Sequence, residues 1–262
     1  MSVITLTTEY SHSDYYIGAI KGAIISNCSD ITVVDLAHDI PKNNIAQAAF
    51  ILRSCYKQFP PGSIHLVCVN SEANLRSKHL VIKSNNHYFI CADNGFPGLL
   101  FDSLPDQIIE LETLENQTTF PELYVFASSA IHIIGGGEII ELGNEIFEIN
   151  KYTSFMPFVE KTKDENIVLT GSIIYIDSYG NAITNISKKQ FEDLSEGKQF
   201  SIHPHSNHHK ISKINKSFFE TEDGEIMAIF NSLNLLEIAQ KNGSANVMLR
   251  LNVNDNIRII FK

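Results

Sequence analysis

A change of pattern near the middle of the chain constrains the fold most strongly. In the first half, apolar and β-branched runs alternate with segments whose apolar residues recur at helical spacing. In the second half, short strand-like runs follow one another with little helical pattern between them. Strand–helix–strand units form parallel sheets, whereas successive short strands form antiparallel barrels or sandwiches. We therefore expect two domains, divided within the aperiodic stretch 150–166.

The first predicted domain, residues 1–158, is an α/β domain with a largely parallel sheet. Its predicted elements are strand 3–8, helix 14–27, strand 31–36, helix 44–58, strand 64–70, a hairpin-like pair 79–83 and 88–92, and helix 122–134. Three glycines, Gly135, Gly136 and Gly137, follow the last helix and suit its C-terminal cap.

The second predicted domain, residues 159–262, is an antiparallel β-barrel. Its predicted strands are 168–177, 182–186, 199–203, 210–214, 226–230, 245–249 and 258–261. After strand 226–230 the pattern at 235–239 indicates a short helix, which would begin close to Ser232.

Charge and composition exclude several classes of partner. The 262 residues carry 20 Lys and Arg against 30 Asp and Glu, a net charge of −10 that repels phosphate backbones and anionic lipids. We expect no nucleic-acid or membrane partner. No apolar run approaches the roughly 20 residues needed to span a bilayer, and the N-terminus has no signal-peptide pattern, so we expect a cytoplasmic protein.

The cysteines and histidines do not predict a metal site. The four cysteines lie in apolar surroundings without CxxC spacing, which indicates buried free thiols. The histidines between positions 203 and 209 lie in a loop-like segment without a fixed scaffold, so adventitious metal affinity is the simpler interpretation. They are Cys28, Cys55, Cys68 and Cys91, and His203, His205, His208 and His209.

Polar residues follow three predicted strands of the first domain. Ligands of open parallel sheets bind beyond the carboxyl ends of the strands, so these residues are candidates for a binding crevice. Capping and turn formation are the alternative roles. The residues are Thr7, Thr8, Glu9 and Asp14 after the first strand, Asp35 and His38 after the second, and Asn70, Ser71 and Glu72 after the third. No GxGxxG or GxxxxGK[ST] motif is present to cradle a phosphate.

The densest polar segment of the second domain is DSYGNAITNI at 177–186. Tyr179, Gly180 and Asn181 are good turn residues, and a tight hairpin explains them. Alternatively, the carboxylate of Asp177, the ring of Tyr179 and the amide of Asn181 could bind an ammonium group and the edge of a purine. Ser232, at the start of the predicted short helix, could bind a carboxylate.

Several segments, in the same order over nearly the whole chain, resemble the S-adenosylmethionine hydroxide adenosyltransferases, relatives of the S-adenosylmethionine-dependent fluorinase and chlorinase. The last two of these segments together, D-x-[FY]-G-N and N-S-x-x-x-L-E-I-A, are specific. The segments are ITLTTEY at 4–10, DYYIGAIKG at 14–22, VDLAHDIP at 34–41, FPPG at 59–62, ADNG at 92–95, DSYGN at 177–181 and NSLNLLEIA at 231–239.

The resemblance implies a homotrimer that holds S-adenosylmethionine between the N-terminal domain of one subunit and the C-terminal domain of the next. The nucleoside is then substrate or ligand, and no separate cofactor is needed. The implied roles are ribose binding by Glu9, ammonium binding by Asp14 and Asp177, adenine binding by Asn181 near Tyr179, carboxylate binding by Ser232, and purine stacking by Phe218 or Phe219. Glu9 stands where the family usually has Asp, which lengthens its reach by one methylene.

The resemblance also implies a reaction: water displaces methionine from the ribose 5′ carbon and leaves adenosine. The family activates water with an Asp, an Arg and a His. Asn70 stands in place of the Asp, Pro121 stands in place of the His, and Arg76 lies one residue closer than the family pattern. Because neither Asn70 nor Pro121 can act as a base, we hypothesise that Glu72, in the same loop as Asn70, replaces the lost carboxylate. Nothing marks a halide pocket.

The sequence leaves three functions open. The first is an S-adenosylmethionine hydrolase, slow or rewired, with Asn70, Glu72 and Arg76 around the attacking water. The second is a protein that binds S-adenosylmethionine or adenosine without turnover, which the residues at 70 and 121 favour. The third is an α/β trimer that binds no nucleoside and uses its polar residues only as caps and turns.

Overall fold

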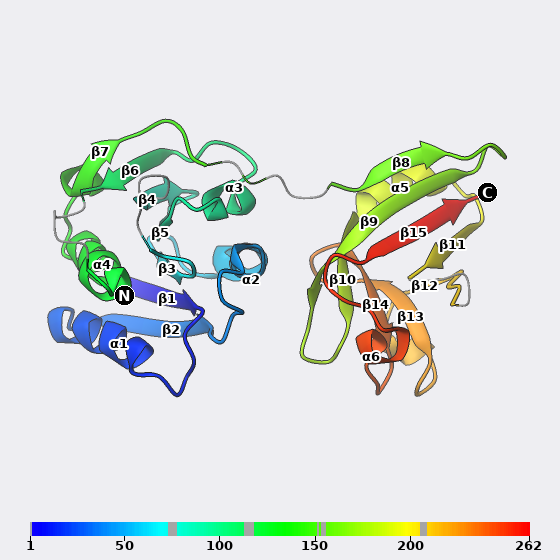
Figure 1. The fold of residues 1–262 in the computed structure, drawn as a ribbon, viewed down its shortest axis with the longest axis horizontal. Helices are drawn as coiled ribbons and strands as arrows, with labels where there is room; N and C mark the ends of the chain where they lie inside the picture. The colour runs from blue at the N-terminus through cyan, green and yellow to red at the C-terminus, as the bar shows by residue number, and fades with distance from the viewer. Residues whose placement is uncertain (1, 73–77, 113–117, 151, 153–155, 205–208) are drawn as a thin grey trace. The chain divides into compact units, whose positions relative to one another are not determined.

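A computed structural model describes the chain except residues 1, 73–77, 113–117, 151, 153–155 and 205–208 (Figure 1). The chain divides into two units, Met1–Thr153 and Ser154–Lys262. The first contains a sheet whose first four strands in spatial order are parallel, and the second contains a curled, nearly all-antiparallel sheet. The predicted fold class is therefore confirmed. No helix of the described chain has the length and apolar character needed to cross a membrane.

The N-terminal unit is built on a seven-stranded sheet of order β2-β1-β3-β5-β4-β6-β7. The strands β2, β1, β3 and β5 pair in parallel, and β4, β6 and β7 add antiparallel pairs at the other edge. The strands are β1 Ser2–Thr8, β2 Ile31–Ala37, β3 Ile64–Cys68, β4 His79–Ser84, β5 His87–Ala92, β6 Gln107–Leu111 and β7 Gly143–Glu145. The strands β6 and β7 were not predicted from the sequence.

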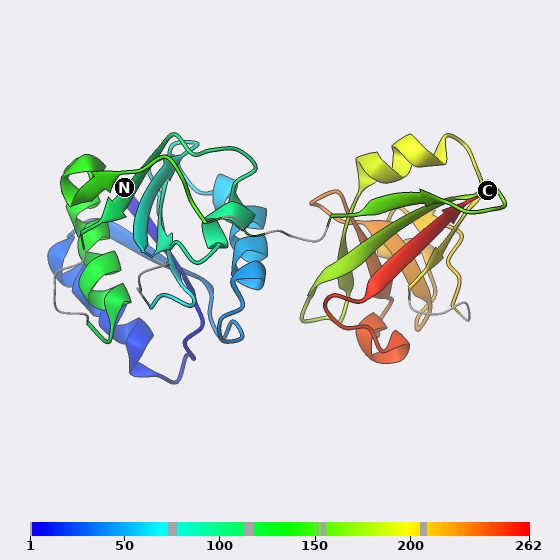
Figure 2. The same ribbon diagram turned by 45° about the horizontal axis from the view of Figure 1, so that its top comes forward.

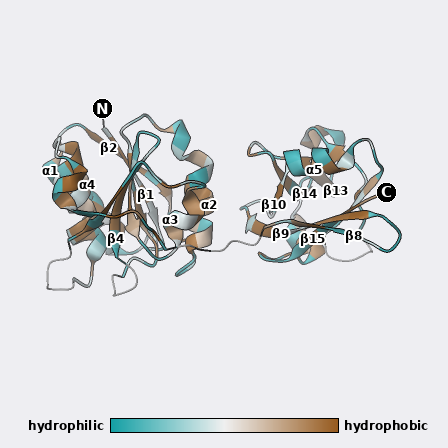
Figure 3. Cartoon of the chain, turned by 90° about the horizontal axis from the view of Figure 1, so that it is seen from above, coloured by the Kyte–Doolittle hydropathy of each residue, from teal (hydrophilic) through white to brown (hydrophobic). Residues whose placement is uncertain are grey.

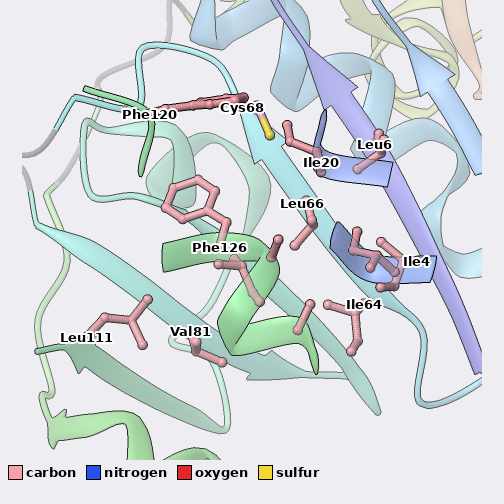
Figure 4. Close-up of a cluster of buried hydrophobic side chains, with 14 of the residues drawn as sticks. Ile4, Leu6, Ile20, Ile64, Leu66, Cys68, Val81, Leu111, Phe120 and Phe126 are labelled. Carbon is pink, nitrogen blue, oxygen red and sulfur yellow. The ribbon is translucent and has the colours of Figure 1, made fainter. Parts of the chain in front are cut away.

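Helices cover both faces of this sheet (Figure 3). One face packs against α1 (Tyr15–Asn27) and α4 (Ser128–Ile134), and the other against α2 (Ile45–Cys55) and α3 (Phe96–Leu100). Every residue of β3 is buried, because both faces of this central strand are covered. Figure 4 shows part of the first core, with Ile4, Leu66 and Phe126 among its side chains.

Capping residues and short turns define the ends of the helices in this unit. The side chain of Asn44 accepts a hydrogen bond from the Gln47 amide and so caps the start of α2. A six-residue π-helix, Glu122–Ala127, leads directly into α4, and Gly135 ends that helix as the sequence predicted. Short 3-10 turns follow α2 and precede β7, at Tyr56–Gln58 and Ile139–Leu142.

The C-terminal unit is an eight-stranded sheet in which β11-β15-β9-β10-β14-β13-β12 are neighbours and β8 also pairs with β9. Figures 1 and 2 show the sheet curling, with β9 and β15 side by side. The elements are β8 Phe158–Lys161, β9 Ile167–Ile176, β10 Ala182–Ser187, α5 Lys188–Ser195, β11 Phe200–His203, β12 Ile214–Asn215, the 3-10 turn Phe218–Glu220, β13 Ile226–Phe230, β14 Leu235–Gln240, α6 Ala245–Leu249 and β15 Asn256–Phe261.

Two assignments in this unit were wrong. Residues 235–239, predicted as a short helix, form the strand β14 between β13 and β10. Its central residues are buried, which fits a strand covered on both faces. Residues 245–249, predicted as a strand, form the helix α6: Ala245 and Leu249, one turn apart, are buried, while Val247 and Met248 are exposed. Each segment has only five residues, four of them apolar, and this pattern fits a strand or a helix, so the sequence alone could not decide.

The sequence pattern also misjudged smaller elements. The strand expected at 210–214 reduces to an isolated bridge at Ile211 and the two-residue strand β12. The helix α5 was missed, although Ser187 and Gln190 form a capping box at its start. The strand β8 lies within the stretch that was expected to link the domains.

Candidate functional site

The polar residues that follow β1 and β3 meet at the carboxyl edge of the sheet. Thr8 and Cys68 are paired at the ends of these strands, and the Glu9 amide donates to the Cys68 carbonyl. The Glu9 carboxylate then accepts from two backbone amides, Asn43 N at 2.6 Å and Asn70 N at 3.1 Å. One side chain therefore joins the loops that follow β1, β2 and β3, as the rule for open parallel sheets leads one to expect.

The loop that holds Asn70 is shaped by its neighbours. Asn70 has a φ of 50°, in the left-handed region that Asn tolerates. The side-chain amide of Asn94 donates to the Val69 carbonyl at 3.1 Å and the Asn70 carbonyl at 2.8 Å, and its oxygen accepts from Phe96 N. This bracing fixes the backbone of Asn70. It explains the ADNG segment as a structural element of the site.

A buried carboxyl group that sequence analysis did not single out lies at the same edge. Glu122, the first residue of the π-helix, is 4% exposed. Burial raises the pKa of Glu122, and the nearby Glu9 carboxylate adds to the increase, while hydrogen bonds from its own backbone amide, from Tyr10 and from Ser71 partly offset it. Burial and Glu122 in turn raise the pKa of the Tyr10 hydroxyl. In the sequence, Glu122 is the one carboxylate within the apolar run 120–127. Burial of such a group is costly unless it is paired or hydrogen-bonded, and this could have drawn attention to it.

Aromatic side chains flank this group. The Tyr10 and Tyr16 rings stack with centroids 4.5 Å apart, and the edge of Phe120 packs against both at 6.1 and 5.1 Å. Tyr15 packs on Tyr16 at 4.2 Å and is exposed. Asp14, just before α1, is exposed and makes no side-chain capping bond to the helix. Its carboxylate is thus open to solvent.

A second polar chain runs from the end of β1 to α1. The Thr8 hydroxyl lies 2.8 Å from Nδ1 of His38, whose Nε2 lies 3.0 Å from the Asp35 carboxylate. Lys21 is 2.6 Å from the same carboxylate. Burial raises the pKa of Asp35, but Lys21 and His38 outweigh burial and hold the pKa below its usual value. These contacts position the His38 ring beside the loop that contains Glu9.

In the C-terminal unit, Asp177 organises the turn between β9 and β10. Its Oδ1 accepts from the amides of Tyr179 at 3.0 Å and Asn181 at 2.9 Å, and its Oδ2 accepts from the Asn181 side-chain amide at 3.0 Å. Gly180 has a φ of 82°, which suits glycine. The turn therefore has the hairpin geometry that the sequence allowed, and it presents Tyr179 with 77% of its surface exposed.

A second carboxyl group lies close to this turn. Glu237 of β14 is buried, and burial together with the Asp177 charge raises its pKa against the effect of a hydrogen bond from Asn231 at 3.1 Å. Ser232 is exposed in the turn between β13 and β14, not at a helix start as predicted, because β14 is a strand. Phe219, in a 3-10 turn, is 93% exposed.

The predicted site residues thus fall into two groups. Glu9 and Asn70 are joined in the N-terminal unit, while Asp177 and Asn181 are joined in the C-terminal unit. Asp14, Glu72, Tyr179, Ser232 and Phe219 are exposed, and Arg76 lies outside the described residues. Within the described residues, no group of three or more His, Cys, Asp or Glu side chains is placed to hold a metal ion. The cysteines are free thiols, three buried and Cys55 half-buried.

Comparison with known proteins agrees with the sequence motifs. The model of the SAM hydroxide adenosyltransferase N-terminal domain matches residues 4–143, and that of the C-terminal domain matches residues 171–258. An (R)-S-adenosyl-L-methionine hydrolase of Methanocaldococcus jannaschii is 28% identical, over 100% of this chain and 97% of the relative. A hydrolase of the same name from Thermus thermophilus is 24% identical, over 99% of this chain and 100% of the relative.

Solved structures share the fold. An uncharacterized conserved protein from Thermotoga maritima superposes with a TM-score of 0.85 at 24% identity, over 99% of both chains. A conserved hypothetical protein from Thermus thermophilus superposes with a TM-score of 0.75 at 24% identity, over 99% of this chain and 100% of that one. Since the two family models together span most of the sequence, the chain belongs to the SAM hydroxide adenosyltransferase family.

Proposed function

We propose that this protein hydrolyses S-adenosylmethionine to adenosine and methionine. The observation that carries the proposal is the end-to-end match to proteins named (R)-S-adenosyl-L-methionine hydrolase. Water attacks the ribose 5′ carbon, and the carbon–sulfur bond breaks with its electron pair going to sulfur. Because the sulfonium is a good leaving group, the protein mainly has to position the ribose and the water.

The described side chains support the binding roles that the family implies. Glu9 and Asp177 already accept backbone amides, and each carboxylate has further lone pairs for hydroxyls or an ammonium group. Asp14 and Ser232 are exposed and available for the methionine ammonium and carboxylate. Tyr179 and Phe219 present open aromatic faces, which suit stacking on adenine, and Asn181 suits recognition of its edge.

The proposal includes a cytoplasmic homotrimer with each nucleoside site between two subunits. Its support is the family together with large exposed aromatic residues on both units, which are costly to leave in water unless a ligand or another subunit covers them. These residues are Tyr15, Tyr124, Tyr179 and Phe219.

A second candidate is a protein that binds the same nucleoside without turnover. Asn70 and Pro121 favour it, because neither side chain can take a proton from water. Both candidates use the same binding residues and differ only in whether a base is available.

One experiment separates the two. The purified protein is incubated with S-adenosylmethionine, with and without chloride, and adenosine, 5′-chloroadenosine and methionine are quantified by chromatography, while calorimetry measures binding. We expect adenosine and methionine in equal amounts, above a control without protein. Binding without product would support the second candidate, and the absence of both would exclude the two together. 5′-Chloroadenosine would show halide as the nucleophile instead of water.

A further inference from the structure

Glu122 is a buried carboxyl group that the fold compensates with hydrogen bonds but not with a positive charge among the described residues. It is 4% exposed, and no Lys, Arg or His forms an ion pair with it among the described residues. A buried ionisable group normally has a partner, because an unpaired one destabilises the folded state. A residue that costs stability in this way is a candidate for a chemical role.

Two polar atoms at this place lack a well-formed hydrogen bond among the described residues. Neither Oε2 of Glu122 nor Oγ of Ser71 has a hydrogen bond of good geometry within the described part of the chain, and both atoms are shielded from solvent. Ser71 nevertheless lies close enough to influence the Glu122 carboxyl. Buried polar atoms in native proteins are nearly always satisfied, often by a bound water. The arrangement therefore has the donor and acceptor capacity to hold one water molecule.

Glu122 also lies where the fold would place a ligand. Ser71 follows Asn70, whose amide is bound by Glu9, and Tyr10 follows Glu9. Glu122 is thus grouped with the residues beyond the carboxyl ends of β1 and β3, where open parallel sheets bind their ligands. A π-helix begins at Glu122, and such segments occur frequently at functional sites.

Resting on the proposed hydrolysis, we propose that Glu122 is the base that accepts a proton from the attacking water. As the water oxygen bonds to the ribose 5′ carbon, the carbon–sulfur bond breaks and methionine leaves as a neutral thioether. The water proton passes to Glu122 Oε2 and later to solvent, so the net products are adenosine, methionine and one proton.

Other residues near the water-activating position are less suited to this task. The Asn70 amide has no basic atom, and Pro121 has no polar side chain. Glu72, the substitute considered from the sequence, is exposed to solvent, whereas Glu122 is buried. Burial gives Glu122 a pKa above its usual value, closer to neutral pH, where general bases are most effective.

Several other titratable groups lie around Glu122. Glu9 and Tyr10 follow β1, and Cys68 ends β3. His79 of β4 reaches the same loop through the Ser71 carbonyl, 2.7 Å from its Nε2, and burial lowers the pKa of this histidine. Tyr10 and Cys68 have raised pKa values and remain neutral, so Glu122, with Glu9 as its neighbouring charge, governs the acidic limb of the rate profile.

The test compares Glu122→Gln with Glu145→Gln, a matched substitution of an exposed glutamate on the edge strand β7. We expect Glu122→Gln to lower kcat by about 100-fold or more, the usual contribution of a general base, with little change in S-adenosylmethionine affinity by calorimetry. Glu145→Gln should match the wild type. The wild-type kcat should rise with pH through the raised pKa of Glu122, and this limb should disappear in Glu122→Gln.

A second variant guards against a folding defect. Glu122→Asp keeps the carboxyl group but withdraws it by one methylene, so it should recover part of the rate and regain the pH limb. Equal kcat in Glu122→Gln and wild type, with thermal unfolding showing both folded, would overturn the role of Glu122 and leave the hydrolysis intact. Failure of the wild-type protein to release adenosine would overturn the hydrolysis and this role with it.

Discussion

The carboxyl edge of the N-terminal sheet and the Asp177 turn of the C-terminal unit satisfy their polar groups in opposite ways. The Asp177 carboxylate accepts hydrogen bonds from residues two and four positions further along the chain. Glu9 accepts from Asn43 and Asn70, which are 34 and 61 positions away. Asp177 and Asn181 are thus arranged by a local turn. Glu9 and Asn70 are brought together only when the sheet places three loops side by side.

Two carboxyl groups within the N-terminal unit differ in a similar way. Glu9 is used twice by the backbone and ties loops together. Glu122, close to it, is more deeply buried and has an oxygen without a well-formed hydrogen bond among the described residues. We therefore expect Glu9 to stabilise the folded state and Glu122 to destabilise it. On this view Glu9 has a structural role and Glu122 a chemical one.

Removal of Glu9 should have the largest effect on stability. Glu9→Ala leaves the amides of Asn43 and Asn70 without their acceptor, and each hydrogen bond to a charged group contributes about 1.5–3 kcal/mol. We expect a loss of about 3 kcal/mol in the free energy of unfolding, measured by urea denaturation. A loss below about 1 kcal/mol would show that water replaces the carboxylate at no cost.

Removal of Asp177 should have a smaller effect, because its partners are local and the turn is partly open to water. Asp177→Ala should lower the free energy of unfolding by about 1–2 kcal/mol and weaken nucleoside binding at the same time. Asp177→Asn, which retains one side-chain acceptor, serves as the control and should keep more of the stability than of the binding. Unchanged calorimetric binding in both variants would remove Asp177 from the predicted ligand set.

This difference between local and long-range contacts also explains what the sequence could predict. The hairpin at Asp177–Asn181 could be predicted because all of its hydrogen-bonding residues lie within five positions of the sequence. The alternating strands and helices of the first half could be predicted from the periodicity of apolar residues. The contact between Glu9 and Asn70 could not be predicted from the sequence. The sequence supports only the general expectation that the ends of parallel strands lie close together.

The errors have equally specific causes. Residues 235–239 and 245–249 are too short for their apolar pattern to separate a strand from a helix, and only the pairing of β14 with two neighbours settles the first. Glu122 was overlooked because its significance depends on burial beside Tyr10 and Ser71, which are 112 and 51 positions away in the sequence. Periodicity carries no information on such a juxtaposition.

The Glu122 carboxyl should make stability depend on pH in a defined direction. The folded state raises its pKa above the ordinary value of 4.5, so in this range the folded state binds more protons than the unfolded state. Its contribution is neutral below 4.5 and becomes progressively unfavourable as pH rises through the raised pKa. Glu122→Gln, which cannot ionise, should therefore be more stable than the wild type at pH 8, and the difference should shrink toward pH 5.

Thermal unfolding across this pH range measures the difference, with Glu145→Gln as the control for loss of a negative charge. A Glu122→Gln protein that is much less stable than the wild type at pH 8 would mean that the ionised carboxylate has partners that support the fold. The contrast between Glu9 and Glu122 would then be lost.

The smallest effect on stability is expected at Tyr179. Its ring is 77% exposed, and surface side chains of this kind change the free energy of unfolding by less than about 0.5 kcal/mol when truncated. If the ring stacks on adenine, Tyr179→Ala should still weaken S-adenosylmethionine binding several-fold, since an aromatic pair contributes about 0.5–1.5 kcal/mol beyond its buried area. Tyr179→Phe should retain the affinity, because the ring face and not the hydroxyl makes the contact. Equal affinity in wild type and Tyr179→Ala would reduce the turn to its structural role, with Asp177 holding a hairpin and nothing else.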